Sequence, residues 1–191
     1  MTMEFKDIEY AALKNVAELM YLAARTAPKA SGKDFLEIKL LEKDEIESLY
    51  QGMIKYGKET GQKRFERDAI NVSNSRIIVL IGLKDAAPSG LNCGACGFDK
   101  CEELKPDKVI EFKGPQCAIR LLDLGIAIGS AVKIAGMLNV DNRIMYRIGA
   151  VARRIGLTEA DIVMGIPLSC SGKNIYFDRF EDYKHWQGFS S

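Results

Sequence analysis

Apolar residues recur at helical spacing through the first part of the chain. Over Phe5–Ala27 they repeat every three or four positions, as expected for one buried face of a helix, and Pro28 ends the pattern. The same spacing predicts helices at Asp44–Gly57 and Gly61–Asn71. The short apolar run Phe35–Leu41, which lies just ahead of the acidic start of the second helix, predicts a strand.

The second half of the chain contains a different mixture of patterns. Arg76–Leu83 is a continuous, β-branched apolar run between polar turns, typical of a centre strand buried on both faces. A helix rich in Ala and Gly is predicted at Gln116–Leu138, and its small residues would allow another helix to approach closely. A further helix is predicted at Asp141–Ile155, with Asp141 as its N-cap, and a last strand at Asp161–Leu168. We therefore expect an α+β fold with several helices around a small sheet.

Between these patterns, residues 84–117 show no sustained period. Clusters of Gly and Pro interrupt this stretch, which predicts a loop-rich insert with its own organising centre. The chain has 191 residues and is 47% apolar, enough for one sizeable core. We expect a single domain over residues 1–191, with the cysteine-rich insert inside it.

Four of the five cysteines lie in or directly after this insert, with the spacing C-x2-C-x4-C-x15-C. A [4Fe–4S] cluster takes four thiolates, one for each iron. Glycines follow the first two cysteines directly, and they would permit tight turns that leave backbone N–H groups free to point at cluster sulfurs. The last cysteine opens the apolar helix, whose N-terminus would face an anionic cluster. The candidate ligands are Cys93, Cys96, Cys101 and Cys117.

Zinc and unligated thiols are the alternatives to a cluster. Zinc also accepts four cysteines, often as two C-x2-C pairs. Only one such pair is present here, and the asymmetric gaps of four and fifteen residues suit a cubane better than a zinc ribbon.

Charge and hydropathy narrow the functional class further. Lys plus Arg number 27 against 26 acids, which argues against a nucleic-acid-binding protein. The charged first residues do not resemble a signal peptide, and the most apolar stretch, Leu121–Leu138, contains Asp123 and Lys133, so it predicts a buried helix and not a membrane span. We expect a cytoplasmic protein, and in a reducing compartment clustered cysteines more often bind metals or carry redox chemistry than form disulfides.

The cysteine motif and the wider chain resemble known families. The segment "CGACGFDKC…GPQC" resembles the iron–sulfur domain of corrinoid iron–sulfur proteins and of the electron-transfer B subunit of sodium-pumping membrane complexes, which implies that all four cysteines are cluster ligands. The segments "DLGIAIGSAVKIA", "VDNRIMYRIG" and "GIPLSCSGKNIYFDR" resemble uncharacterised bacterial and archaeal ferredoxin-domain proteins. That family supplies no reaction.

The order of segments also resembles the nitroreductase-like flavoproteins. "TAPKASGKDFLEIKLL", "NSRIIVLIGL", "DLGIAIGSAVKIAGMLNV" and "ADIVMGIPL" follow one another as in that family. The resemblance implies a nitroreductase-like α+β fold, with a small antiparallel-type sheet surrounded by helices. It also implies an intertwined homodimer with FMN at the dimer interface. Of the arginine-rich opening of that family, only Arg25 lies nearby.

Two cationic loops are candidates for a flavin phosphate. The loop that follows the first helix contains Gly and three basic residues, and a second Ser-Gly-Lys sequence occurs at Ser171–Lys173. If the two loops meet, they would form one anion site; otherwise both are ordinary polar turns. The candidate cofactor-binding residues are Arg25, Lys29, Ser31, Gly32, Lys173 and Arg179.

Other polar residues have simpler interpretations. We expect Cys170 to be a small, partly buried apolar residue in preference to a redox thiol, and the single histidine, His185, to lie on the surface. Asp123 should pair with Arg120 or Arg143, or face a cofactor pocket. Four arginines predict a basic face on one helix, either solvated or docked to an acidic redox partner: Arg143, Arg147, Arg153 and Arg154.

Together these patterns predict an iron–sulfur redox protein. It would act in electron transfer or as an oxidoreductase, with a [4Fe–4S] cluster and FMN as candidate cofactors, a homodimeric state and a redox partner protein. The alternative is a non-enzymatic binding or sensing domain stapled by zinc or by a structural cluster. No catalytic acid, base or nucleophile stands out.

Overall fold

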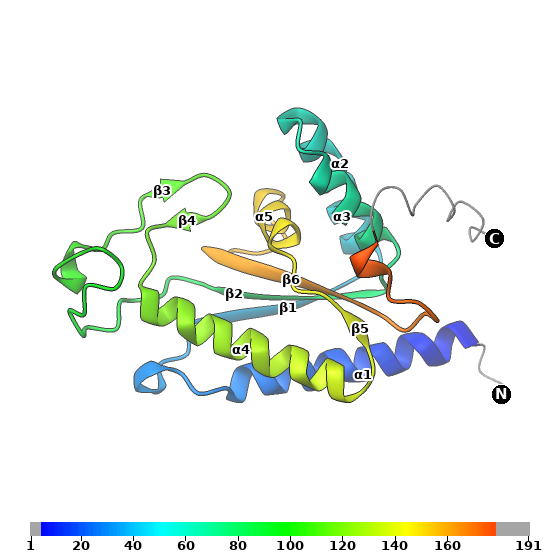
Figure 1. Cartoon of the computed structure of the whole chain (residues 1–191), viewed down its shortest axis with the longest axis horizontal. Coiled ribbons are helices and arrows are strands. Elements are labelled where there is room, and N and C mark those ends of the chain that lie inside the picture. Colours follow the sequence, from blue (N-terminus) through cyan, green and yellow to red (C-terminus); the bar gives the residue numbers. More distant parts are fainter. Residues whose placement is uncertain (1–4, 179–191) are drawn as a thin grey trace.

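A computed structural model describes residues 5–178 of the chain. Its main sheet has four strands in the order β1 (Leu36–Glu42), β2 (Ile77–Leu83), β6 (Ile162–Ser169) and β5 (Asp141–Asn142), and every neighbouring pair is antiparallel. Figure 1 shows this sheet between two layers of helices. The α+β fold expected from the sequence, with a small antiparallel sheet surrounded by helices, is confirmed.

Strand β2 lies in the interior of the sheet, between β1 and β6, and all of its residues are buried. Ile77, Val79 and Ile81 belong to the hydrophobic core on one face of the sheet. Ile78 and Leu80 belong to the core on the other face. Because both faces of the strand are covered, its sequence is continuously apolar and does not alternate.

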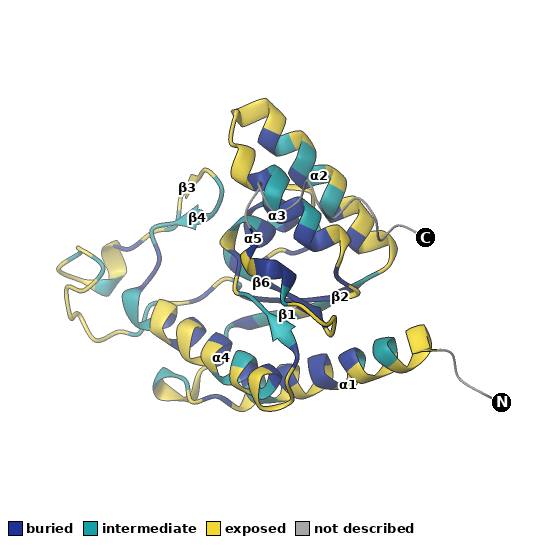
Figure 2. Cartoon of the chain, turned by 45° about the vertical axis from the view of Figure 1, so that its right-hand side comes forward, coloured by how far each residue is buried: buried dark blue, intermediate teal, exposed yellow. Residues whose placement is uncertain are grey.

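Two helical layers supply those cores. Helices α1 (Phe5–Thr26) and α4 (Ala118–Met137) cover one face of the sheet, while α2 (Asp44–Thr60), α3 (Lys63–Ser73) and α5 (Tyr146–Arg154) cover the other. In Figure 2 buried and exposed residues alternate along α1 and α4, as an amphipathic helix requires. The predicted helices on α1, α2, α3 and α4 are confirmed, with ends that differ by up to three residues.

The predicted helix Asp141–Ile155 is partly wrong. Its first two residues form β5, which pairs with Ser169 and Leu168 at the edge of the sheet, and the helix begins only at Tyr146. Asp141 is therefore not an N-cap. Edge pairing across the sheet satisfies the backbone groups of this segment, and helical spacing along the sequence carries no sign of it.

Two glycines let α5 lie unusually close to β6. A Cβ atom on Gly149 would lie 1.9 Å from the carbonyl oxygen of Val163, and a Cβ atom on Gly165 would lie 2.0 Å from Cγ2 of Ile148. Real Cβ atoms do not approach other atoms so closely, so both positions require glycine.

The insert of residues 84–117 leaves the sheet after β2 and returns at the start of α4. It contains the short 3₁₀ helix Cys101–Glu103 and a small hairpin of β3 (Lys108–Val109) and β4 (Lys113–Gly114). In Figure 1 it extends past the end of the main sheet, and most of its residues are exposed. Within residues 5–178, no helix combines the length and apolarity needed to cross a membrane.

Candidate functional site: a cysteine-bearing loop

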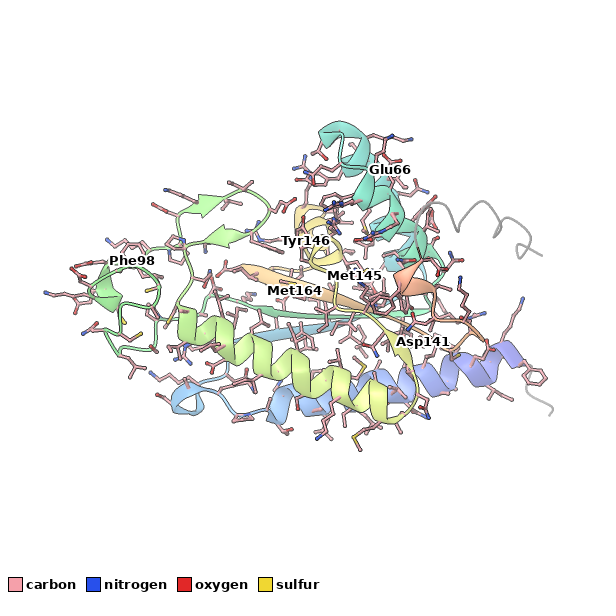
Figure 3. The ribbon with its side chains drawn as sticks, viewed as in Figure 1. Glu66, Phe98, Asp141, Met145, Tyr146 and Met164 are labelled. Carbon is pink, nitrogen blue, oxygen red and sulfur yellow. The ribbon has the colours of Figure 1, made fainter. Side chains whose placement is uncertain are left out.

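The four candidate ligands lie on the insert and at the start of α4. Cys93 is exposed, Cys96 and Cys101 are half-buried, Cys117 is buried, and none of them forms a disulfide. In Figure 3 Phe98 marks this loop, well away from Asp141 and from the centre of the sheet. The loop that carries Cys93, Cys96 and Cys101 therefore lies at one extremity of the molecule, whereas Cys117 is buried at the start of α4.

Asn92 closes the loop around the first three cysteines. Its backbone N–H donates to Sγ of Cys101 across 3.4 Å, and its side-chain oxygen accepts from the backbone N–H of Cys101 at 2.8 Å. These two bonds hold Cys101 against Asn92, the residue that precedes Cys93.

Left-handed backbone conformations bend the same loop tightly. Gly94 and Gly97 have φ values of 71° and 86°, and the N–H of Gly97 donates to the carbonyl of Gly94 at 2.9 Å around Cys96. The tight turns expected at both glycines are confirmed. Turns of this kind direct backbone N–H groups toward a common centre, which favours an anion.

Cys117 occupies the N-cap position of α4. Burial works to raise the pKa of its thiol, but hydrogen bonds from the backbone N–H groups of Ser89, Arg120 and Ile119 outweigh that effect, so the pKa lies below its ordinary value. The thiol also lies 3.8 Å from the hydroxyl oxygen of Ser89. A helix N-terminus with these donors stabilises a thiolate.

The four cysteine thiols suit a metal cluster by their chemistry, although they are not arranged around one centre. Three free thiols lie on a loop bent at two glycines, and the fourth, at the start of α4, has a lowered pKa. Within residues 5–178, no three His, Cys, Asp or Glu side chains are grouped so that they could hold a metal ion. The thiols fit the chemistry of a [4Fe–4S] cluster, which needs four thiolates and tolerates amide donors to sulfur.

Asp161 fixes both ends of the insert to the core. Its buried carboxylate accepts a hydrogen bond from the backbone N–H of Asp85 at 3.2 Å and lies 3.3 Å from Nζ of Lys113. Its backbone carbonyl also accepts from the N–H of Lys113 at 2.9 Å. No local pattern predicts this role, because Asp161 is 76 residues from Asp85 along the chain.

The buried pair Arg120–Asp123 fixes the start of α4. Nη1 of Arg120 donates to Oδ2 of Asp123 at 2.9 Å, as the sequence predicted for one of the two candidate partners. The same guanidinium reaches the carbonyls of Ala87 and Ala30, which belong to two different loops. The pair therefore joins the insert, the loop after α1 and the first turn of α4.

The first predicted anion loop uses its cations internally. Nη1 of Arg25 donates to Asp34 at 2.8 Å and to the carbonyl of Leu36 at 3.0 Å. Nζ of Lys29 donates to the carbonyls of Ala24, Arg25 and Ala27, which closes the end of α1. Ser31 and Gly32 form a left-handed turn with φ values of 56° and 63°. In this arrangement Arg25 and Lys29 are engaged within the chain.

The two predicted anion loops do not meet within one chain. The first loop enters β1 at Leu36, which pairs with Leu83, whereas the second follows the opposite end of β6, where Leu168 pairs with Ile77. Strands of seven residues separate the two ends by about 20 Å. Lys173, in the second loop, donates to Asp178 at 2.9 Å. Arg179 and His185 lie outside the described residues.

Two adjoining cavities open at the end of the sheet opposite the insert. The larger has a volume of about 690 Å³ and the smaller about 200 Å³, and both are lined by Asn74 and Arg76. Cys170 lines the smaller cavity and is exposed, so the expectation of a partly buried apolar residue is wrong. The walls of the larger cavity include the basic residues Lys6, Lys43 and Arg76.

The four arginines expected on one basic helix face are engaged with the chain itself. Arg143 lies before α5 and donates to the carbonyl of Tyr176, so it does not share a helix with the others. Arg147 contacts Asp68, and Arg153 donates to the carbonyl of Ala160. Arg154 contacts Glu59 and the ring of Tyr56. This segment therefore does not form a basic face of arginines that is free to dock a partner.

Comparison with known proteins places the chain among proteins without an assigned reaction. Residues 113–179 match the family described as "Uncharacterized protein containing a ferredoxin domain (DUF2148)", a stretch that includes Cys117. An uncharacterized protein of Archaeoglobus fulgidus is 48% identical over 181 residues, which cover 94% of this chain and 98% of that protein.

Solved structures with a similar fold include an FMN-dependent nitroreductase and a putative NADH oxidase. An FMN-dependent nitroreductase of Mycobacterium smegmatis, solved with NADPH, superposes with a TM-score of 0.54 at 10% identity, over 83% of this chain and 78% of that one. A putative NADH oxidase of Clostridium acetobutylicum gives a TM-score of 0.50 at 14% identity, over 90% and 86%. At these identities the likeness establishes a nitroreductase-like fold.

Proposed function

Because this chain belongs to the family of uncharacterized proteins containing a ferredoxin domain and has a nitroreductase-like fold, we propose that it is an iron–sulfur redox protein. Family and fold together indicate a redox role. The proposal is more specific: Cys93, Cys96, Cys101 and Cys117 hold a [4Fe–4S] cluster. The observation that carries it is Cys117, a thiol at a helix N-terminus whose surrounding N–H donors favour the thiolate.

A bound [4Fe–4S] cluster supplies single-electron transfer. The protein contributes hydrogen-bond donors to the sulfurs and partial exclusion of water. N–H donors at Cys117 and Cys101 favour negative charge on the sulfurs, and burial of Cys117 excludes water on the side of the core. The exposed loop at Cys93 leaves the opposite side accessible, which suits exchange of electrons with a redox partner protein.

Single Cys→Ser variants test the ligand set. After anaerobic purification, iron per chain should fall sharply when any of Cys93, Cys96, Cys101 or Cys117 is replaced. Cys170→Ser is the matched control, because that thiol is exposed at the opposite end of the sheet, and it should retain the wild-type iron content. Unchanged iron in Cys101→Ser would remove that residue from the ligand set. Zinc in place of iron and sulfide would support the stapled binding domain instead.

We also propose a homodimer, formed through the outer sides of α1 and α4. Figure 2 shows exposed residues along this side of both helices. Counting about 150–200 Å² for each large side chain, the apolar residues there expose roughly 700 Å². That exceeds the patch of about 300–600 Å² found on a typical monomer and approaches the ~800 Å² per partner of a standard interface. These residues are Ile8, Leu19, Leu22, Leu121, Leu122, Ile126, Met137 and Leu138.

A second copy of this chain fits that surface because no atoms of the same chain cover the outer side of α4 near its centre. Gly125 and Gly129 have no atom within 4 Å of where a Cβ would stand, so another helix can approach the backbone there. Light scattering after size-exclusion chromatography should give a dimer for the wild type and a monomer for Ile126→Glu. Lys55→Glu, on the exposed side of α2, is the matched control and should remain dimeric. A monomeric wild type would contradict the proposal.

FMN is the proposed second cofactor, and the larger cavity is its proposed site. The similar Mycobacterium smegmatis protein is FMN-dependent. When bound, FMN exchanges electrons singly or in pairs. A volume of about 690 Å³ lies within the range of cofactor sites. Its walls carry Lys6, Lys43 and Arg76 against Asp7 and Glu47, and this excess of positive charge would attract a phosphate.

Titration with FMN tests this site by quenching of flavin fluorescence. Arg76→Ala should weaken binding about tenfold or more, because one charge-assisted contact is lost. Lys33→Ala is the control in the first predicted anion loop and should bind FMN as the wild type does. The opposite ranking of the two variants, or no quenching in the wild type, would contradict the site.

A further inference from the structure

The side chain of Arg120 is only 1% exposed, although it carries a permanent charge. Burying an arginine is costly unless its charge is paired and its N–H groups are satisfied. Here one carboxylate and two backbone carbonyls accept from it, and its guanidinium carbon lies 4.9 Å from the centre of the Phe35 ring. This buried cation, Arg120, lies three residues after Cys117 in the sequence.

The contact with Ala87 connects Arg120 to the surroundings of Cys117. Nε of Arg120 donates to the carbonyl of Ala87 at 3.0 Å. Two residues further along, past Pro88, the hydroxyl oxygen of Ser89 lies 3.8 Å from the sulfur of Cys117. Pro88 has a fixed φ and leaves this link little freedom. The position of Ala87 therefore determines where the Ser89 donors point.

The remaining contacts of Arg120 fix its own position. Oδ2 of Asp123 accepts from Nη1 of Arg120 at 2.9 Å, while Oδ1 of Asp123 accepts from the backbone N–H of Ala30 at 2.9 Å. Nη1 of Arg120 also donates to the carbonyl of Ala30 at 3.0 Å. The guanidinium is thus anchored on α4 and on the loop after α1, and it presents a fixed donor to the insert.

Building on the proposed iron–sulfur function, we propose that Arg120 is a positioning residue that holds the Ser89 donors against the Cys117 sulfur and thereby raises the reduction potential of the cluster. A hydrogen bond to a ligand sulfur favours the more negative, reduced form. Loss of the tether at Ala87 frees the Ser89 segment, weakens those bonds, and shifts the potential to more negative values.

The test compares Arg120→Met with Arg147→Met. Arg147 pairs with buried Asp68 on the opposite face of the sheet, so its loss removes a buried ion pair without touching the contacts of Arg120. Two quantities are measured: the reduction potential of the anaerobically purified protein by optical titration, and amide hydrogen exchange of the segment 84–92. Exchange reports on the Ser89 amide whether or not a cluster is bound.

Arg120→Met should shift the potential to more negative values and lose protection at the Ser89 amide, while Arg147→Met changes neither. Arg120→Lys keeps the charge but not the forked donor geometry, so it should give an intermediate potential, and it replaces the methionine variant if that variant fails to fold. Wild-type potential and protection in the Arg120 variants, or equal changes in Arg147→Met, would overturn the inference. A wild type that lacks iron and sulfide would overturn the proposed function, and the exchange comparison would still decide the tether.

Discussion

Replacing Gly149 by alanine should destabilise the fold severely, because the added methyl group meets backbone. The new Cβ would lie 1.9 Å from the carbonyl oxygen of Val163 and 2.6 Å from its carbonyl carbon. An ordinary contact between such atoms is about 3.3 Å or longer, so α5 would have to move more than about 1 Å from β6. No side-chain rotation can relieve the clash.

The cost follows from what α5 buries. Ile148, Val151 and Ala152 on this helix are at most 1% exposed and pack in the core between the sheet and α2 and α3. Moving the helix away opens voids beside all three, and overpacking of this kind costs about 3 kcal/mol or more. For a chain of this length that corresponds to a melting temperature lower by roughly 6–12 °C.

Thermal unfolding followed by circular dichroism measures the effect. Gly136→Ala is the matched control, because a Cβ at Gly136 in α4 would meet no atom within 4 Å. It should be neutral or stabilising by up to about 1 kcal/mol, as helix propensity predicts. If Gly149→Ala unfolds within a degree or two of the wild type, the close seating of α5 on β6 is wrong.

Three further variants extend the predictions. Asp161→Asn keeps an acceptor for the N–H of Asp85 but loses the charge that pairs with Lys113, so it should cost about 1 kcal/mol in urea unfolding and lower iron retention. Asp68→Ala leaves its two arginine partners without a buried counter-charge and should cost about 3–5 kcal/mol in the same assay. Burial raises the pKa of Tyr176 to about 12, and the hydroxyl of Ser75, which lies 2.9 Å from the phenolic oxygen, works against that shift. Because the folded state holds this proton more tightly, its contribution of about 2–3 kcal/mol is complete below about pH 10 and is lost between about pH 10 and 12. Tyr176→Phe should abolish that part of the pH dependence, and an unchanged profile would refute the assignment.

Much of the fold could be predicted because its signals are local. The run Ile77–Leu83 is apolar without interruption since both faces of the strand are covered, and that pattern is visible in the sequence alone. The long helices followed from the spacing of their buried residues. The cysteine spacing was equally legible, because its members lie within 25 residues of one another.

The misses share a different cause, namely contacts between residues far apart in the chain. Asp141 becomes part of a strand because β6 offers an edge to pair with, and Arg147 becomes internal because Asp68 lies opposite, 79 residues away. Whether the two cationic loops meet also depends on strand pairing, which places them at opposite ends of the sheet within one chain. The anchoring of the insert by Asp161 and Arg120 depends on such contacts too.

An anaerobic purification of the wild-type protein, examined by visible absorption together with iron and acid-labile sulfide analysis, tests the iron–sulfur proposal most directly. Four thiolates around a [4Fe–4S] cluster predict broad brown absorbance that dithionite bleaches, with iron and sulfide in equal amounts. A colourless protein that contains zinc would contradict electron transfer by this loop and would leave a zinc-stapled binding domain.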